Sequence, residues 1–222
     1  MNQGFKWGFW LCFVGLFCMG FRVYEPTQPW DALSRQSSAT TKLFVIYEQA
    51  SMALTNNLPS DDGLYGSSTI TVAQAMDSIF ADYNSVQAAY VSLVDNTDPD
   101  YNATAAARRT IYVRNKAADG ANLGQAQFSV DEDGVYKCEV ALTDSVYDDA
   151  KTYIGVVTHE LGHCLGLDHP QEVTRSVMSY FSEEGVIRLQ VDDKMAVTYL
   201  YPVSPKASQE DPTFGLSCAA RE

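Results

Sequence analysis

The most constraining feature of this 222-residue sequence is the run HELGHCLGLDH, which begins at His159. His163 follows His159 by four residues, so on an α-helix both imidazoles project from one face and can reach a single ion. Gly166 comes three residues after His163, and glycine tolerates the positive φ that lets a chain leave a helix and turn back. His169 then supplies a third nitrogen. The spacing therefore predicts a helix that ends in a metal-binding turn.

The number and kind of these side chains indicate a catalytic zinc site. Three histidine nitrogens leave a fourth tetrahedral position for water, as in catalytic rather than structural zinc sites. Glu160 follows the first ligand, where its carboxylate can reach a zinc-bound water without binding the metal. The chain has three histidines and all of them lie in the run, so the sequence predicts one zinc ion. We expect metal-assisted hydrolysis with Glu160 as the general base.

The sequence outside this run resembles the metzincin zinc endopeptidases, weakly over residues 42–202 and strongly over 153–202. Metzincins place a methionine in a tight turn beneath the metal, and Met178 in the segment SVMSY matches that turn, nine residues after the third histidine. The last segment, from Leu189 to Pro202 with its paired aspartates, resembles the third helix of the matrixins. The chain is therefore identified as matrixin-like.

The resemblance also implies a mode of action on protein or peptide substrates. Tyr180 follows the turn methionine by two residues, as in astacins and serralysins, which implies either a tyrosine that stabilises the transition state or a packed aromatic. The resemblance places an extended substrate along residues 125–130, and it makes residues 181–189 a wall of the pocket for the side chain after the cleaved bond. The pair Glu183–Glu184 would favour basic side chains there, or is a solvated face. Two other functions remain open: zinc binding without catalysis, and hydrolysis of a non-peptide bond.

The order of expected elements predicts a mixed α/β sheet with the chemistry on its second helix. The resemblance implies a metzincin catalytic domain, an α/β (α+β) fold with a mostly parallel twisted sheet, an active-site helix and a C-terminal helix. Strands are expected at 42–48, 110–114, 125–130 and 135–142, the last two joined in a hairpin. Helices are expected at about 71–89, behind a capping box of Thr71 and Gln74, at 147–165 and at 191–200. Turn residues predict a loop from the first strand to about residue 68 and another around 96–102.

The N-terminal segment predicts export from the cytoplasm. Residues 7–21 carry no charge, but at about 1.5 Å per helical residue they fall short of the roughly 30 Å bilayer core. We therefore expect a signal peptide at 1–21 or, because no small-x-small cleavage site is evident, an uncleaved anchor; lipid attachment at Cys18 is a third option. Residues 22–41 are expected to be a linker or short pro-segment, 42–203 the catalytic domain, and 204–222 a C-terminal tail. The protein is expected to be extracytoplasmic and monomeric, touching the membrane only through such an anchor.

Charge and cysteine content restrict the remaining partners. The formal net charge of −13 argues against a nucleic-acid partner, which would attract a basic surface. Asp131, Glu132 and Asp133 are either part of a solvated acidic surface or calcium ligands. Three of the five cysteines lie outside the export segment: Cys138, Cys164 and Cys218. In an oxidising compartment this odd number predicts one disulfide and one free thiol, with the pair undecided. Cys164 could instead be a small buried residue of the helix.

Overall fold

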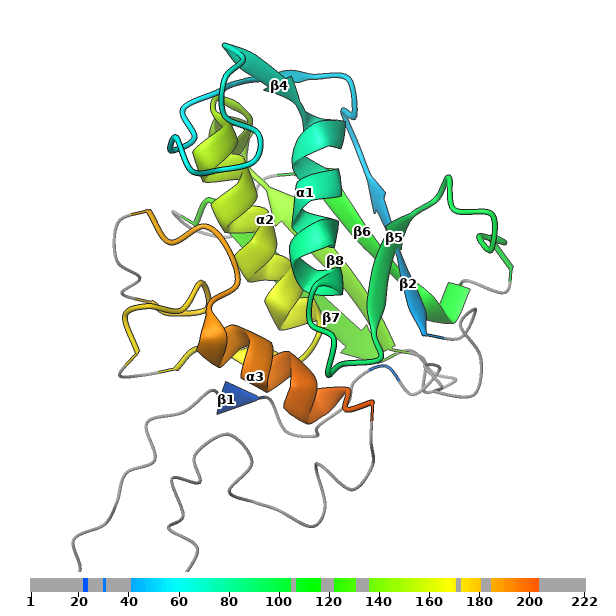
Figure 1. The fold of residues 1–222 in the computed structure, drawn as a ribbon. Coiled ribbons are helices and arrows are strands. Elements are labelled where there is room, and N and C mark those ends of the chain that lie inside the picture. The colour runs from blue at the N-terminus through cyan, green and yellow to red at the C-terminus, as the bar shows by residue number, and fades with distance from the viewer. Residues whose placement is uncertain are drawn as a thin grey trace, which may run out of the picture.

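The centre of the domain is a five-stranded sheet with the strand order β5-β2-β6-β8-β7 (Figure 1). The computed structural model describes residues 22–23, 30, 41–104, 107–116, 122–130, 136–170, 173–180 and 185–203. The strands are β2 (Lys42–Tyr47), β5 (Ser92–Asp95), β6 (Thr110–Asn115), β7 (Gly124–Val130) and β8 (Tyr136–Leu142). Neighbouring strands are parallel except at the edge, where β7 runs antiparallel to β8. The prediction of a mixed, mostly parallel sheet is confirmed.

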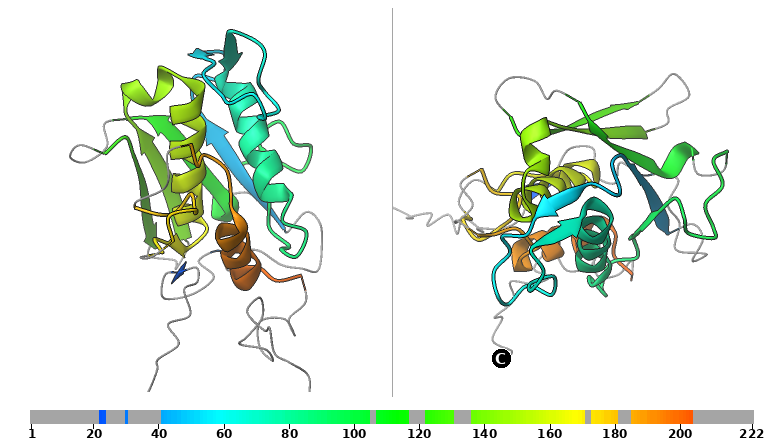
Figure 2. Two further views of the ribbon diagram at one scale, coloured as in Figure 1. Left: turned by 60° about the vertical axis from the view of Figure 1, so that its left-hand side comes forward. Right: turned by 90° about the horizontal axis from the view of Figure 1, so that it is seen from above.

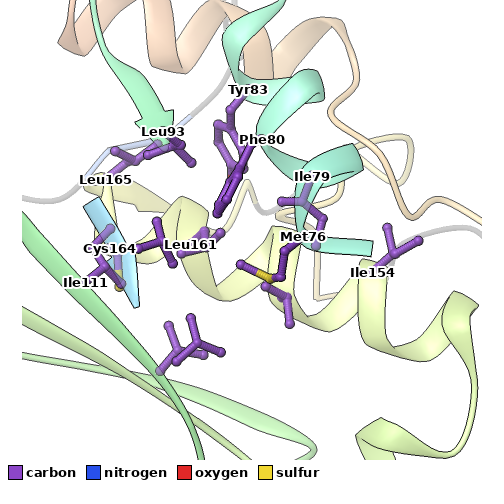
Figure 3. Close-up of a cluster of buried hydrophobic side chains, with 14 of the residues drawn as sticks. Met76, Ile79, Phe80, Tyr83, Leu93, Ile111, Ile154, Leu161, Cys164 and Leu165 are labelled. Carbon is purple, nitrogen blue, oxygen red and sulfur yellow. The ribbon is translucent and has the colours of Figure 1, made fainter. Parts of the chain in front are cut away.

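Two helices, α1 (Val72–Asn84) and α2 (Ala150–Cys164), cover one face of this sheet, and a third, α3 (Val191–Leu200), lies below them in the view of Figure 1 (Figures 1 and 2). Helix α1 begins with the predicted capping box, in which the Gln74 amide donates to Thr71 Oγ1 over 3.2 Å and the Thr71 amide donates to Gln74 Oε1 over 2.8 Å. Its apolar face meets α2 and the sheet in one hydrophobic core (Figure 3). Burial of the apolar faces of both helices fixes α2, which carries His159 and His163, against the sheet.

Short elements depart from the expected pattern. Helix α1 ends at Asn84, five residues before the predicted end, because the Asn84 side chain turns to bond both backbone groups of Leu93 in β5. The predicted loop after β2 contains a small antiparallel pair, β3 (Ala53–Thr55) with β4 (Thr69–Thr71). Helix α2 begins at Ala150 rather than near Tyr147, since a 3₁₀ turn (Asp144–Tyr147) precedes it.

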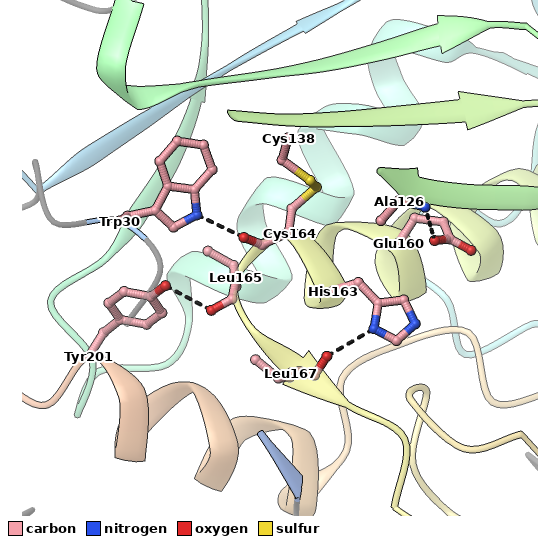
Figure 4. The surroundings of a disulfide bond; sticks show 9 residues. All are labelled: Trp30, Ala126, Cys138, Glu160, His163, Cys164, Leu165, Leu167 and Tyr201. Carbon is pink, nitrogen blue, oxygen red and sulfur yellow. Dashed lines mark hydrogen bonds between the residues drawn. A yellow bond between two sulfur atoms is a disulfide. The ribbon is translucent and has the colours of Figure 1, made fainter. Parts of the chain in front are cut away.

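Two points of the N-terminal segment pack onto the domain. Strand β1 (Arg22–Val23) pairs antiparallel with β9 (Leu167–Asp168), which immediately precedes the third histidine of the run. Trp30 is only 2% exposed, and its indole Nε1 donates to the Cys164 carbonyl over 2.8 Å (Figure 4). The stretch expected to be a linker or pro-segment thus contacts β9 at one point and the end of α2 at the other.

A disulfide joins Cys138 on β8 to Cys164, the last residue of α2 (Figure 4). The sequence left the pair undecided, and the structure selects these two residues. Cys218 lies outside the described residues, as do the calcium candidates Asp131–Asp133, the pair Glu183–Glu184 and the uncharged run 7–21. Within the described ranges no helix is long and apolar enough to cross a membrane.

Candidate metal centre

The three histidines of the run converge on one point. His159 and His163 project from α2, and His169 follows strand β9. The Nε2 atom of His169 lies 3.1 Å from Nε2 of His159 and 3.2 Å from Nε2 of His163. Gly166 has a φ of +97°, the left-handed conformation that the sequence predicted for the turn between the second and third histidine. In the part of the chain that the structure describes, these residues are the group suited to hold a metal ion.

Backbone carbonyls orient two of the rings so that Nε2 faces the centre. His159 Nδ1 lies 2.7 Å from the Val177 carbonyl, and His163 Nδ1 lies 2.9 Å from the Leu167 carbonyl (Figure 4). A carbonyl only accepts hydrogen bonds, so each Nδ1 carries the proton and each Nε2 keeps a lone pair for a ligand. Burial, helped by the nearby His159, lowers the pKa of His163 to about 3. A neutral imidazole is the form that binds a metal ion.

Glu160 lies in the same cleft and is fixed by the edge strand. It is 7% exposed, and its Oε2 accepts a hydrogen bond from the Ala126 amide of β7 over 2.7 Å (Figure 4). Burial raises the pKa of Glu160, although His159 and the Ala126 amide oppose the shift. Close approach of β7 needs Gly124, since a Cβ there would lie 2.6 Å from Val156 Cγ1 and 3.0 Å from Glu160 Cγ.

Met178 packs against the helix that carries two of the histidines. It is 1% exposed and packs against the backbone of α2 at Gly162. A Cβ on Gly162 would overlap the Met178 sulfur and would lie 3.2 Å from the Tyr83 hydroxyl. The sequence analysis did not single out Gly162, but a glycine inside a helical pattern is a signal for such a close contact.

Asp193 of α3 holds the turn that contains the methionine. Its buried carboxylate, 2% exposed, accepts hydrogen bonds from the Ser176 hydroxyl (2.5 Å), the Val177 amide (3.0 Å) and the Gln190 amide (2.8 Å). One carboxylate thus ties the start of α3 to the turn whose Val177 carbonyl orients His159. The second of the paired aspartates noted in the sequence acts here as a support for the site.

Tyr180 stacks on the third histidine from the solvent side. Its ring centroid lies 3.5 Å from that of His169, with 17° between the ring planes. The side chain is 69% exposed, so Tyr180 packs on one face only and borders the open cleft.

The cleft that contains these groups has a volume of about 950 Å³. Its floor is α2, one wall is the start of β7 with residues 122–126, and the other wall includes Val186 and Ile187. The structure brings together the three histidines and Glu160, which the sequence predicted as zinc ligands and general base, and it buries Met178 against the same helix. The sequence did not show the Ala126 amide, since backbone donors leave no residue-type signal.

Comparison with known proteins points in one direction. The profile of the matrixin family matches residues 79–202, more than half of the chain. No curated protein matches this chain. The solved structure named "GM1 bound form of the ECX AB5 holotoxin" is similar with a TM-score of 0.47 and 12% identity, over 83% of this chain and 89% of that chain. A likeness at that level supports no conclusion about this chain.

Proposed function

The chain belongs to the matrixin family of zinc metalloendopeptidases, and we propose that it cleaves extracytoplasmic proteins with Glu160 as the general base. His159, His163 and His169 hold the single zinc ion. The observation that carries the proposal is the convergence of three histidine nitrogens beside a carboxylate in an open cleft. The disulfide to Cys164 supports an oxidising compartment.

The donor set fits zinc in both chemistry and spacing. Ligands about 2.05 Å from a shared tetrahedral centre lie roughly 3.3 Å apart, close to the 3.1 and 3.2 Å that separate His169 Nε2 from the other two Nε2 atoms. Bound there, Zn²⁺ would polarise the scissile carbonyl and lower the pKa of the attacking water. The carbonyls of Val177 and Leu167 keep two of the rings in the ligating orientation.

Glu160 moves the proton. The Ala126 amide holds Oε2, and the other carboxylate oxygen, Oε1, accepts a proton from the attacking water. The same carboxyl then donates that proton to the leaving amine. Because burial raises the pKa of Glu160, the carboxylate is a stronger base than a solvated glutamate. Tyr180, which is held on His169 by stacking, donates a hydrogen bond to the oxyanion in this proposal.

Substrate binds along β7. Among the described residues this strand lies at one edge of the sheet, next to β8, and an edge strand can pair with an added strand. The edge runs beside α2 at Gly124 and Ala126, so an extended peptide added to it would cross the metal centre. Main-chain pairing gives affinity for many sequences, and side-chain pockets give the selection.

The test compares wild type, Glu160→Gln and Tyr180→Phe, each zinc-loaded, on an unfolded protein substrate. We expect Glu160→Gln to lose about 10²- to 10⁴-fold in kcat while its zinc affinity stays close to that of wild type, because Glu160 is not a ligand. Tyr180→Phe should lose at least about tenfold in kcat with little change in KM. Cleavage that survives Glu160→Gln would remove the assigned base. A folded, zinc-loaded wild type that cleaves no peptide would favour zinc binding without catalysis or a non-peptide substrate.

A further inference from the structure

The cleft continues beyond the histidines toward the N-terminal end of α2. Lys151, Gly155 and His159 follow one another at intervals of four residues and all line the cleft. Residues at this spacing lie on one stripe of a helix. At about 1.5 Å per residue, Lys151 lies roughly 12 Å along the helix from His159. The stripe therefore forms a channel floor that leads from the metal centre to a lysine.

Gly155 keeps this channel open. A Cβ at this position would lie 3.2 Å from Ile187 Cγ2 and 3.6 Å from Ile187 Cβ. Any larger side chain on α2 here would fill the space between the helix and the segment that carries Val186 and Ile187. The middle of the channel is apolar, lined by Val156, Val186 and Ile187. It therefore suits the methylene groups of a substrate side chain.

Lys151 places an uncompensated positive charge at the end of the channel. Its backbone amide donates to Asn57 Oδ1 over 2.9 Å, but its ammonium group has no ion pair in the described structure. The nearby carboxylate of Asp149 accepts hydrogen bonds from Thr152 and Asn57 instead. Among the described residues that line the cleft, Glu160 is the only acid. In a chain with a net charge of −13, this cation faces a pocket rather than an acidic partner.

We propose that Lys151 selects glutamate as the residue that follows the cleaved bond (P1′), through the channel that Gly155 keeps open. The inference rests on the proposed peptidase function. A P1′ side chain starts beside the metal centre, passes the apolar walls with its methylenes and meets the ammonium with its carboxylate. The lysine stem is long and flexible, and glutamate adds the length that aspartate lacks. The pair is partly shielded from water, where a charge-assisted hydrogen bond is stronger than at an open surface.

The acids at 183 and 184 predict the opposite preference. If Glu183 and Glu184, which lie outside the described residues, governed the pocket, lysine or arginine would be preferred at P1′. One set of peptides separates these outcomes: a single sequence with Glu, Gln, Asp, Lys, Leu or Ala at P1′. The full zinc-loaded chain is assayed on each peptide for kcat/KM.

Four variants locate the cause of any preference. Lys151→Met removes the charge but keeps the length, Lys151→Glu reverses the charge, and Gly155→Leu fills the channel. Lys116→Met is the matched control, because it removes one positive charge at a site outside the cleft, where Lys116 pairs with Glu139. Thermal unfolding of each variant reports whether it is folded.

For wild type and Lys116→Met we expect kcat/KM for the Glu peptide to exceed that for the Gln peptide by about tenfold. Lys151→Met should bring the two within about twofold, Lys151→Glu should favour the Lys peptide, and Gly155→Leu should cleave only the Ala peptide well. Equal rates on the Glu, Gln and Lys peptides, or a wild-type preference for Lys, would overturn the inference while leaving the peptidase intact. If wild type cleaves none of the peptides, or Glu160→Gln cleaves them as fast, the proposed function fails and this inference fails with it.

Discussion

Removal of the Cys138–Cys164 disulfide has a predictable effect on the free energy of unfolding. The two cysteines are 26 residues apart in sequence, and a cross-link of this span lowers the entropy of the unfolded chain by an amount that corresponds to about 3.5 kcal/mol at 25 °C. We expect the Cys138→Ala/Cys164→Ala variant to be less stable by this amount. The effect acts on the unfolded chain, so the folded arrangement of the histidines should persist.

Urea unfolding of zinc-free protein under non-reducing conditions measures the change. With a denaturant slope of about 2 kcal/mol/M, the midpoint should fall by roughly 1.5–2 M. Excess EDTA in every sample keeps metal binding from contributing to stability. The single variant Cys138→Ala is the control for the lost side chain, since it breaks the same cross-link and should match the double variant within about 1 kcal/mol.

Two results would refute this reasoning. A loss below about 1 kcal/mol would mean that the cross-link does not restrict the unfolded chain as its span requires. A large loss of zinc affinity in the double variant would mean that the disulfide orders the ligands themselves. We expect the affinity to stay within a few-fold, because the rings of His159 and His163 are oriented by the Val177 and Leu167 carbonyls.

Four further changes test other parts of the structure. Gly162→Ala should destabilise the fold by about 1–3 kcal/mol and weaken zinc binding, because the added methyl overlaps Met178; Gly63→Ala, which meets nothing within 4 Å, should be close to neutral in the same urea titration. Trp30→Phe should cost about 2–3 kcal/mol in urea unfolding, since both the hydrogen bond to the end of α2 and part of the buried ring are lost. Asp149→Ala should cost about 1 kcal/mol at pH 7 through loss of the α2 N-cap. Burial alone raises the pKa of Asp149, but hydrogen bonds from the first turn of α2 outweigh it and lower the pKa below 3.8. The difference in free energy of unfolding between wild type and this variant should therefore be largest above pH 4 and should shrink as the pH falls below it. Zinc removal should abolish cleavage and lower Tm. Compared with protein in free zinc at 1,000 times Kd, the zinc-free protein should lose about 4 kcal/mol of stability. Its far-ultraviolet circular dichroism spectrum should remain that of the folded chain.

Local chemistry made much of this structure predictable from sequence. The capping box at Thr71, the histidine spacing on α2 and the positive φ of Gly166 each depend on residues within a few positions of one another. Helix α3 has the predicted bounds, 191 to 200, because Pro202 stops it two residues later. The same short-range spacing indicated that the three histidines would lie together, as they do, whereas the methionine turn was expected from the family resemblance.

Contacts between distant segments account for what the sequence did not reveal. Strands β3 and β4 have three residues each and β5 has four, too few for alternation to stand out. Trp30 lies in a stretch rich in proline and serine that predicts a linker, and its partner is 134 residues away. The disulfide pair could not be chosen either, since spacing does not define connectivity.

These distant contacts meet at the end of α2, where the metal-binding turn begins. The side chain of Cys164 is tied to β8, its carbonyl accepts from Trp30, and the next carbonyl, that of Leu165, accepts from the Tyr201 hydroxyl over 2.7 Å (Figure 4). Three separate segments thus fix the backbone between His163 and His169. Because the turn is ordered by protein contacts, zinc does not have to supply the free energy that orders it, in contrast to small zinc domains that unfold without metal. The sequence run predicts which atoms would bind zinc, and three independent contacts order the turn between them, so loss of the disulfide alone should leave that turn in place.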